Sequence, residues 1–237
     1  MIADGILIHT EQLTVETNKG SPPRWFVLIE GDGAAWHTPT RPPIDPTPEN
    51  SSVLELAKLV HQSSKSNVLY LARPCQYPKK TGTTCELKDW TTDRFAAKHV
   101  DALLGAFARH VPQGSQVTLF GHSGGGVMAL QLAARLGEGA AIRKIVLTGT
   151  PIDVNAWTQA NGYSELTLEN YADSLRDLAA RSVPVFALFG DLDSVVSESY
   201  MGVAAEAGLS IQARVLTNTS HGQLARSETT LRILLEP

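Results

Sequence analysis

The sequence has no long hydrophobic run, no cluster of basic residues and only two cysteines. None of its apolar segments approaches the roughly 18–20 residues that span a bilayer, and the first residues lack the basic and apolar regions of a signal peptide. We therefore expect a soluble chain without a transmembrane segment. The formal net charge is −4, so no basic field is available to attract nucleic acid.

Signatures of nucleotide and metal binding are also missing. No G-x-x-x-x-G-K-[ST] segment occurs, and the strand-like run 142–150 ends without the acidic residue that a dinucleotide-binding fold places there. Two cysteines with no nearby pair of histidines supply too few ligands for zinc. We expect no metal and no organic cofactor, and a small molecule as the partner.

Apolar runs alternate with helix-like segments along the 237 residues. The runs are nearly continuous rather than strictly alternating, which is typical of parallel strands buried on both faces. This pattern predicts the α/β class: an open, mostly parallel sheet flanked by helices, in one domain over residues 1–237. The strands are expected at 25–29, 67–71, 117–120, 145–147, 183–189 and 211–216.

The remaining segments predict how the sheet is bordered and covered. Residues 6–17 alternate with period two and predict an antiparallel edge strand or a hairpin. Ser52 with Glu55 resembles a capping box, and Thr92 is the expected cap of the helical segment 95–107. The long connections 31–51 and 151–182 are each too short for a large cap domain, so loops and a helix or two should cover the site.

The most informative segment is Gly121-His122-Ser123-Gly124-Gly125, which follows an apolar run and precedes a helix rich in small residues. A G-x-S-x-G turn between a strand and a helix is typical of a nucleophile elbow, in which a serine hydroxyl is exposed beside a helix N-terminus. A glycine-rich turn without chemistry is the alternative. The strand and helix on either side favour a nucleophile.

A serine nucleophile needs a base and an acid, which this type of fold supplies later in the chain in the order acid, then histidine. His221 follows the last predicted strand and is the expected base. Asp193 follows the strand before it and is the preferred acid, because its spacing from Gly190 lets the loop turn away before presenting the carboxylate. Asp191 is expected to be a turn residue. Asp153 is a further candidate acid.

An oxyanion hole needs two backbone N–H groups. The residue after the nucleophile, Gly124, supplies one, and the loop after the strand 25–29 supplies the other, which we assign to Asp32 with Gly33 as a substitute. A simple hairpin turn would explain the glycines of this loop equally well. Trp36, Trp90, Trp157 and Tyr163 are candidates to line an acyl pocket or to pack in the core.

The two cysteines, Cys75 and Cys85, lie close together in a connection rich in proline, glycine and threonine. A disulfide that closes this loop is sterically feasible, and it would imply an oxidising compartment. Two reduced thiols without a common role are the alternative.

The string 121–125, followed by Asp193 and His221, resembles the α/β-hydrolase fold superfamily over nearly the whole chain. Within it, other segments resemble a group of poorly characterised bacterial α/β-hydrolases that are often predicted to be exported or lipid-anchored: Ile29-Glu30-Gly31-Asp32-Gly33, Asp45-Pro46-Thr47-Pro48, residues 70–77, and Cys85 with Trp90-Thr91. This resemblance implies a Cys75–Cys85 bridge and a periplasmic or cell-envelope location, with the leader absent from this chain; the cytoplasm is the alternative. Glu30 stands where many members have a His-Gly pair.

These residues together predict a serine hydrolase. Ser123 would form an acyl-enzyme, His221 would transfer the proton, Asp193 would orient His221, and the amides of Asp32 and Gly124 would stabilise the oxyanion. A carboxylic ester is the expected substrate class. Two alternatives share these residues: an acyltransferase, and a non-catalytic protein that binds a ligand above Ser123. The sequence leaves the oligomeric state open.

Overall fold

The computed structural model describes residues 6–15, 22–33, 41–82 and 84–236, in which the strands form a single seven-stranded sheet. The strand order is β1-β3-β2-β4-β5-β6-β7. Every neighbouring pair is parallel except β1 and β3, which are antiparallel. The strands are β1 (Thr10–Leu13), β2 (Arg24–Ile29), β3 (Asn67–Leu71), β4 (Gln116–His122), β5 (Ala141–Thr148), β6 (Val185–Gly190) and β7 (Ile211–Leu216).

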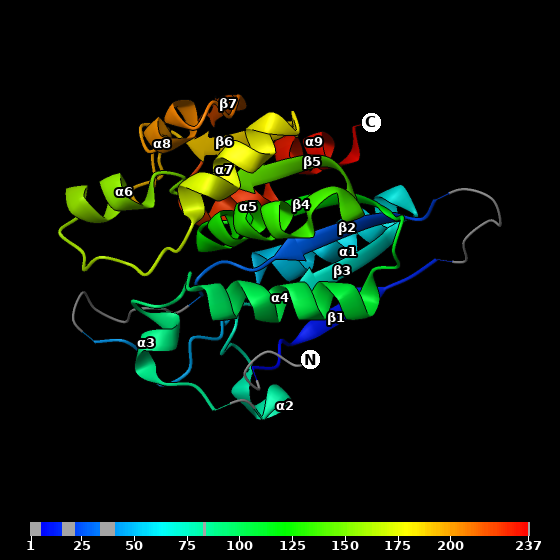
Figure 1. The fold of residues 1–237 in the computed structure, drawn as a ribbon, viewed down its shortest axis with the longest axis horizontal. Coiled ribbons are helices and arrows are strands. Elements are labelled where there is room, and N and C mark those ends of the chain that lie inside the picture. Colours follow the sequence, from blue (N-terminus) through cyan, green and yellow to red (C-terminus); the bar gives the residue numbers. More distant parts are fainter. Residues whose placement is uncertain (1–5, 16–21, 34–40, 83, 237) are drawn as a thin grey trace.

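Helices cover both faces of this sheet (Figure 1). The α-helices are α1 (Ser52–Ser64), α2 (Pro78–Thr81), α3 (Leu87–Trp90), α4 (Ala97–His110), α5 (Gly124–Leu136), α6 (Val154–Ala160), α7 (Tyr171–Ala180), α8 (Gly202–Glu206) and α9 (Glu228–Leu235). Two short 3-10 helices are η1 (Gly137–Gly139) and η2 (His221–Arg226). The expected α/β class, with an open and mostly parallel sheet between helices, is confirmed.

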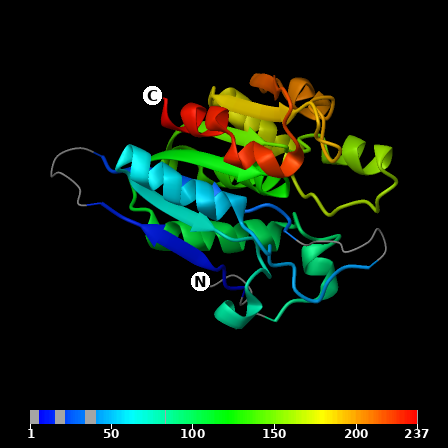
Figure 2. The same cartoon turned by 180° about the vertical axis from the view of Figure 1, so that it is seen from behind.

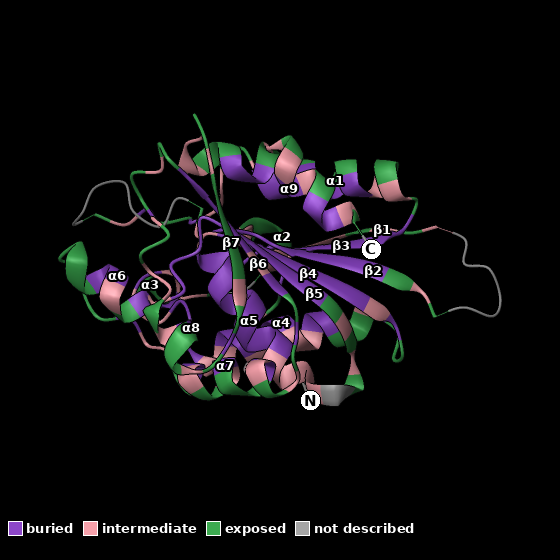
Figure 3. Cartoon of the chain, turned by 90° about the horizontal axis from the view of Figure 1, so that it is seen from above, coloured by how far each residue is buried: buried purple, intermediate pink, exposed green. Residues whose placement is uncertain are grey.

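The core has two halves, one on each side of the sheet. The helices α1 and α9 and the 3-10 helix η2 pack on one face, and α4, α5 and α7 pack on the other (Figure 3). The view from behind shows α1 and α9 in front of the strands (Figure 2). The central strands are buried on both faces because their apolar residues contact helices on both sides. Such burial explains the nearly continuous apolar runs.

The strands at the two edges differ from the central ones. β1 is an antiparallel edge strand, one of the two arrangements that the alternating stretch 6–17 predicts, and residues 16–17 lie outside the described part of the chain. β7 forms the opposite edge, and its residues are partly or fully exposed. The expectation that the run 211–216 is buried on both faces is therefore wrong: of its residues, Ile211 and Leu216 are the ones that pack partly against the core.

The connection 151–182 adds little cover to the sheet's carboxyl edge. α7 packs against α5 as part of the helical layer, which leaves α6 and the segment that follows it above the sheet edge. No large cap domain is present in the described residues. No helix in the described ranges has the length and apolar character needed to cross a membrane.

Candidate active site

Ser123 occupies a tight turn between β4 and α5. Its backbone has φ 52° and ψ −129°, a conformation that L-residues rarely adopt and that persists only where the surrounding structure enforces it. Neighbouring backbone leaves no space for side chains at two flanking glycines. A Cβ on Gly121 would lie 2.4 Å from Cα of Gly126, and one on Gly125 would lie 2.2 Å from the carbonyl oxygen of Glu30. The glycines of the motif are therefore required by close backbone approach.

His221 is hydrogen-bonded to Asp193, with 2.7 Å between Nδ1 and Oδ2. His221 begins η2 just after β7, and Asp193 lies in the loop after β6. The other carboxylate oxygen of Asp193 accepts hydrogen bonds from the amides of Val195 (2.8 Å) and Val196 (2.9 Å). Burial alone would raise the pKa of Asp193, but the hydrogen bonds from His221, Val196 and Val195 more than offset it and hold the pKa below its usual range. The carboxylate is thus both ionised and fixed in position.

The other two candidate acids have different partners. Asp191 is exposed and accepts a hydrogen bond from the amide of Thr219 at 3.1 Å, as a turn residue does. Asp153 caps α6 by accepting a hydrogen bond from Ala156 and contacts the amide of Val203 at 3.3 Å. Of the three, Asp193 is the one that contacts His221.

The end of β5 brings Ser123 and His221 to the same place. The amide of Ser123 donates to the carbonyl oxygen of Thr148 at 2.8 Å, and the His221 ring lies against the next residue, where a Cβ on Gly149 would be 2.8 Å from it. The Ser123 hydroxyl makes no hydrogen bond within the described residues, to His221 or elsewhere. Catalytic hydrogen bonds are often long in structures without substrate, and a hydroxyl turns about a single bond.

His122 stays neutral beside this pair. Burial and the neighbouring His221 charge lower its pKa to about 3. Its Nδ1 faces Thr148, 3.0 Å from the hydroxyl and 3.2 Å from the carbonyl oxygen, while the centre of its ring lies 4.8 Å from that of the His221 ring, with the two rings tilted by 40°. His122 therefore packs beside His221, and its Nδ1 is engaged by Thr148.

Two backbone N–H groups at the elbow are free to bind an anion. The loop after β2 lies over the elbow, because a Cβ on Gly31 would be 3.6 Å from Cβ of Ser123. In the described part of the chain, neither the amide of Asp32 nor that of Gly124 donates a hydrogen bond. These are the two amides predicted for the oxyanion hole. The substitute, Gly33, has a positive φ of 63° and lies farther along the same loop.

Glu30 anchors the start of this loop. It is buried, and its carboxyl group accepts hydrogen bonds from the Ser51 hydroxyl, from the Tyr70 hydroxyl at 2.8 Å and from the Gly31 amide at 3.0 Å. Burial raises the pKa of Glu30, and these three donors together with the charge of Arg73 partly offset the rise. The Glu30 carboxyl group thus stands where many related proteins have a His-Gly pair, and its hydrogen bonds fix the start of the loop.

Cys75 and Cys85 form a disulfide in the structure. Beside it, the side-chain amide of Gln76 donates to the Gly31 carbonyl oxygen at 3.0 Å and accepts a hydrogen bond from the amide of Arg73 at 2.9 Å. Cys75 has a positive φ of 72°, so the chain turns sharply here. The closed loop therefore supports the loop after β2 through Gln76, a role that sequence reasoning missed. Both sulfurs are engaged in the disulfide, which leaves Asp89 alone beside them as a metal-ligating group.

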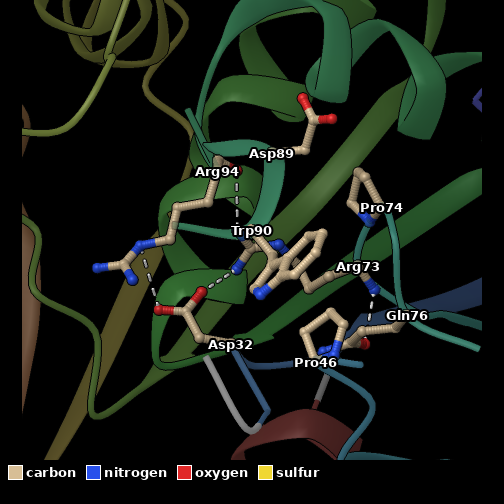
Figure 4. Close-up of a pocket in the computed structure, with 8 residues that line it drawn as sticks. All are labelled: Asp32, Pro46, Arg73, Pro74, Gln76, Asp89, Trp90 and Arg94. Carbon is tan, nitrogen blue, oxygen red and sulfur yellow. Dashed lines mark hydrogen bonds and ion pairs between the residues drawn. The ribbon is translucent and has the colours of Figure 1, made fainter. Parts of the chain in front are cut away.

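Asp32 lies between two arginines that sequence reasoning also missed (Figure 4). Nη1 of Arg73 is 2.5 Å from its Oδ1, and Nε of Arg94 is 3.5 Å from its Oδ2. Burial would raise the pKa of Asp32, yet the charges of Arg94 and Arg73 outweigh burial and lower it. The Asp32 carboxylate packs directly on Gly124, where a Cβ would lie 2.2 Å from Oδ1. The two guanidinium groups thus offset a negative charge that would oppose an oxyanion at Gly124.

Comparison with known proteins agrees with this architecture. Residues 78–207 match the family described as the alpha/beta hydrolase fold. The chain is a member of that family. No curated protein sequence matches it significantly.

The α/β-hydrolase also resembles several solved structures over almost its whole length. Est1E from Butyrivibrio proteoclasticus is 12% identical with a TM-score of 0.60, covering 98% of this chain and 93% of that one. A carboxylesterase of the thaumarchaeon Nitrososphaera gargenis is 13% identical with a TM-score of 0.57, covering 96% and 92%. A putative dienelactone hydrolase from Klebsiella pneumoniae is 14% identical with a TM-score of 0.57, covering 95% and 88%. At these identities the likeness shows the fold.

The aromatic residues that we expected to line an acyl pocket or to pack in the core occupy different positions in this α/β-hydrolase. Trp90 lines a small pocket beside Asp32, and Trp157 donates from Nε1 to the carbonyl oxygen of Val195 at 2.8 Å. Tyr163 packs edge-on against Trp157 at 5.1 Å and is half exposed. Trp36 lies outside the described residues. Trp157 thereby ties α6 to the loop that carries Asp193.

Proposed function

We propose that this α/β-hydrolase is a serine hydrolase that cleaves a carboxylic ester through an acyl-enzyme. The observation that carries the proposal is the hydrogen bond between His221 and Asp193 beside an elbow at which two amides are free. The fold supports it further, since the structural neighbours include Est1E, which has been solved with ferulic acid bound, and an archaeal carboxylesterase.

In the acylation half of the reaction, Oγ of Ser123 attacks the ester carbonyl carbon while Nε2 of His221 takes the hydroxyl proton. The ionised Asp193 holds the Nδ1 proton of His221, which fixes the tautomer and stabilises the imidazolium. The carbonyl oxygen becomes an oxyanion that accepts from the Asp32 and Gly124 amides. The carbon–oxygen bond to the alcohol then breaks, and Nε2 returns the proton to the leaving alkoxide.

In the second half, a water molecule attacks the acyl carbon and gives its proton to Nε2 of His221. The bond to Oγ breaks, the proton returns to Ser123, and the acid is released. The N-terminus of α5 favours the negative charge in both steps, since its first amide, that of Gly124, donates no hydrogen bond within the described residues and the helix dipole is positive at that end. No metal is required in this sequence of steps.

A fluorophosphonate probe, together with a panel of p-nitrophenyl esters, tests the proposal. We expect the probe to label wild-type protein at Ser123, and Ser123→Ala to lose both labelling and turnover. Labelling without turnover of any ester would favour a non-catalytic ligand-binding protein. Turnover that depends on an added alcohol acceptor would favour an acyltransferase. Labelling that persists in Ser123→Ala would contradict the assignment of the nucleophile.

We also propose that the protein resides in an oxidising compartment, the bacterial periplasm or the cell envelope. The Cys75–Cys85 disulfide supports this, because such bonds are rare where thiols are kept reduced. Fractionation of cells that express the natural gene tests the location, and recovery of the protein in the cytoplasmic fraction alone would contradict it.

A further inference from the structure

We propose that Arg94 binds a carboxylate of the substrate beside the oxyanion hole, so that the preferred ester carries a negative charge close to its scissile carbonyl. This inference rests on the proposed esterase function and names the class of substrate. It concerns a residue outside the triad and the oxyanion amides.

The first step is the charge balance around Asp32. Arg73 already satisfies one oxygen of this carboxylate with Nη1, and its Nη2 donates to the carbonyl oxygen of Arg94 at 2.9 Å. Arg94 is therefore the second cation to face one anion, at an ion-pair distance of 3.5 Å. A positive charge remains in excess at this point.

Neighbouring acidic groups do not remove that excess. Glu30 is held by Ser51, Tyr70 and Gly31, and Asp89 pairs with Lys98. Asp93 accepts a hydrogen bond from Thr167, and Glu169 accepts one from the amide of Ala97. Within the described ranges, Asp32 is the one carboxylate that forms an ion pair with Arg94. The Arg94 charge has no full partner of its own.

The second step is the state of the Arg94 hydrogen-bond donors. Its side chain is 6% exposed, and buried guanidinium groups ordinarily have their donors satisfied. The buried Nε has no hydrogen-bond partner, and no residue of the described chain accepts a hydrogen bond from Nη1 or Nη2. Of these three nitrogens only Nε is fully buried, so Nη1 and Nη2 are available to an acceptor that comes from outside.

The third step is where these donors point. Figure 4 shows the Arg94 guanidinium reaching past Asp32, with its terminal amino groups directed away from Arg73. The group lies over the rings of Phe95 (5.4 Å) and Trp157 (5.8 Å), which hold it in place. Trp157 belongs to α6, above the carboxyl edge of the sheet, and the Asp32 carboxylate contacts Gly124. The Asp32 carboxylate therefore lies between the guanidinium group and Gly124, so one side chain separates the guanidinium group from the elbow.

A planar guanidinium with two free terminal nitrogens matches a carboxylate, which accepts two parallel hydrogen bonds from it. The carboxylate can belong to the acyl part, as in the half-ester of a dicarboxylic acid, or to the alcohol part, as in an acylated hydroxy acid. Both sources share the same recognition chemistry, and the substrates below distinguish them.

Two substrate pairs measure the effect of charge by pH-stat. Monoethyl glutarate is compared with diethyl glutarate for the acyl part, and 3-acetoxypropanoate with butyl acetate for the alcohol part. We expect kcat/KM to favour the charged member of at least one pair, and Arg94→Gln to lower the charged-to-neutral ratio about tenfold or more, mainly through KM. Arg94→Lys should keep part of the preference. Arg135→Gln, at the far end of α5, is the control and should leave the ratio unchanged.

Binding without turnover separates this inference from the proposed function. Ser123→Ala protein should melt at a higher temperature with millimolar monoethyl glutarate or 3-acetoxypropanoate, and the Ser123→Ala, Arg94→Gln double variant should not. If wild type cleaves no ester but the shift depends on Arg94, the esterase proposal fails and the carboxylate site stands. A ratio within twofold of wild type in Arg94→Gln for both pairs, or a shift that survives the double substitution, would overturn the Arg94 assignment.

Discussion

The amide of Ser123 is hydrogen-bonded to the carbonyl oxygen of Thr148 at 2.8 Å, which fastens the elbow to the end of the neighbouring strand. This bond, together with the close approach of Gly121 to Gly126, keeps Ser123 at φ 52°. The strain is thus borne by the same residue that the proposal makes the nucleophile. A substitution at position 123 that relieves the backbone strain should therefore raise stability and lower activity.

Ser123→Gly should raise the free energy of unfolding by about 1 kcal/mol and abolish ester hydrolysis, since glycine adopts a positive φ without strain. Ser123→Ala should be equally inactive without that gain in stability, because alanine keeps the Cβ. Urea unfolding and p-nitrophenyl acetate turnover measure the two quantities. Equal stability of the glycine and alanine variants would show that the backbone here is relaxed.

Asp193→Asn should lower kcat roughly a thousandfold or more, because the amide cannot hold the Nδ1 proton of His221 in the required tautomer. The Asn side chain keeps an oxygen for the amides of Val195 and Val196, so the loop should stay folded. Asp191→Asn and Asp153→Asn are matched controls, and each should lower kcat by no more than a few fold. A larger loss in either control would move the role of the acid to that residue.

Removing the disulfide should affect both stability and activity. Cys75→Ser with Cys85→Ser opens a loop of sequence separation 10, which should lower the free energy of unfolding by about 3 kcal/mol. Activity should fall as well, because Gln76 next to Cys75 holds the Gly31 carbonyl oxygen. Denaturant unfolding and ester turnover test the two effects. Thiol counting on unreduced protein made in the periplasm should find no free thiol, and two free thiols would contradict the bridge.

His99 should make the fold sensitive to acid. It is fully buried beside Asp89, and burial, with the charges of Lys98 and Arg73, lowers its pKa from 6.5 to about 4. Because the unfolded chain takes up this proton at higher pH than the folded one, stability is complete above pH 6.5 and falls as the pH drops towards 4. The loss attributable to this one group reaches about 3 kcal/mol.

The variant His99→Leu isolates that contribution. Its free energy of unfolding should be close to that of wild type at pH 7 and should decline less between pH 6.5 and 4.5, as followed by urea titration at each pH. Activity at pH 7 serves as the control for an intact site. Parallel pH profiles for the two proteins would show that other groups cause the acid sensitivity.

The parts of the fold that follow from local pattern were predictable from the sequence. The runs at 67–71 and 211–216 match β3 and β7 residue for residue; buried apolar side chains mark β3, whereas β7 is recognisable from its β-branched and apolar residues although it is largely exposed. The elbow and the order of Asp193 and His221 were also predictable, since a strand-to-helix turn and strand-end loops carry recognisable spacing. Their hydrogen bond follows from the way parallel strands end at one edge.

Helix starts and long-range ion pairs were not predictable in this way. The expected cap Thr92 is wrong: α4 begins at Ala97, and the carbonyl oxygen of Arg94 accepts from the side chain of Arg73 instead of a helix amide. The cap of α1 is Ser51 rather than Ser52, and its hydroxyl also bonds Glu30. In each case the local backbone arrangement depends on a side chain that is distant in sequence. The cluster of Arg73, Arg94 and Asp32 also joins residues that are distant in sequence, so local pattern did not predict it.

Among neutral esters, the site around Ser123 should accept short acyl chains and reject long ones. In the described residues, α6 and the segment 161–170 lie above the sheet edge, and Trp157 ties α6 to the loop of Asp193 through its bond to Val195. A lid that closes over a long chain must move and present a large apolar surface, which a tethered helix of 7 residues does not provide. Trp157 is buried and Tyr163 is half exposed, so we expect the aromatic side chains of this cover to contact a few methylenes only.

Across a series of neutral p-nitrophenyl esters, kcat/KM should therefore rise about fourfold per added methylene over the first few carbons, as about 0.8 kcal/mol of buried CH₂ implies, and then stop. Long-chain esters should be cleaved slowly, with no activation at a lipid interface. Trp157→Phe removes the hydrogen bond to Val195 while keeping an aromatic ring, so it should loosen α6 and shift the optimum towards longer chains. A rate that keeps climbing through long-chain esters in wild type, together with interfacial activation, would show that α6 moves as a lid and that the protein is a lipase.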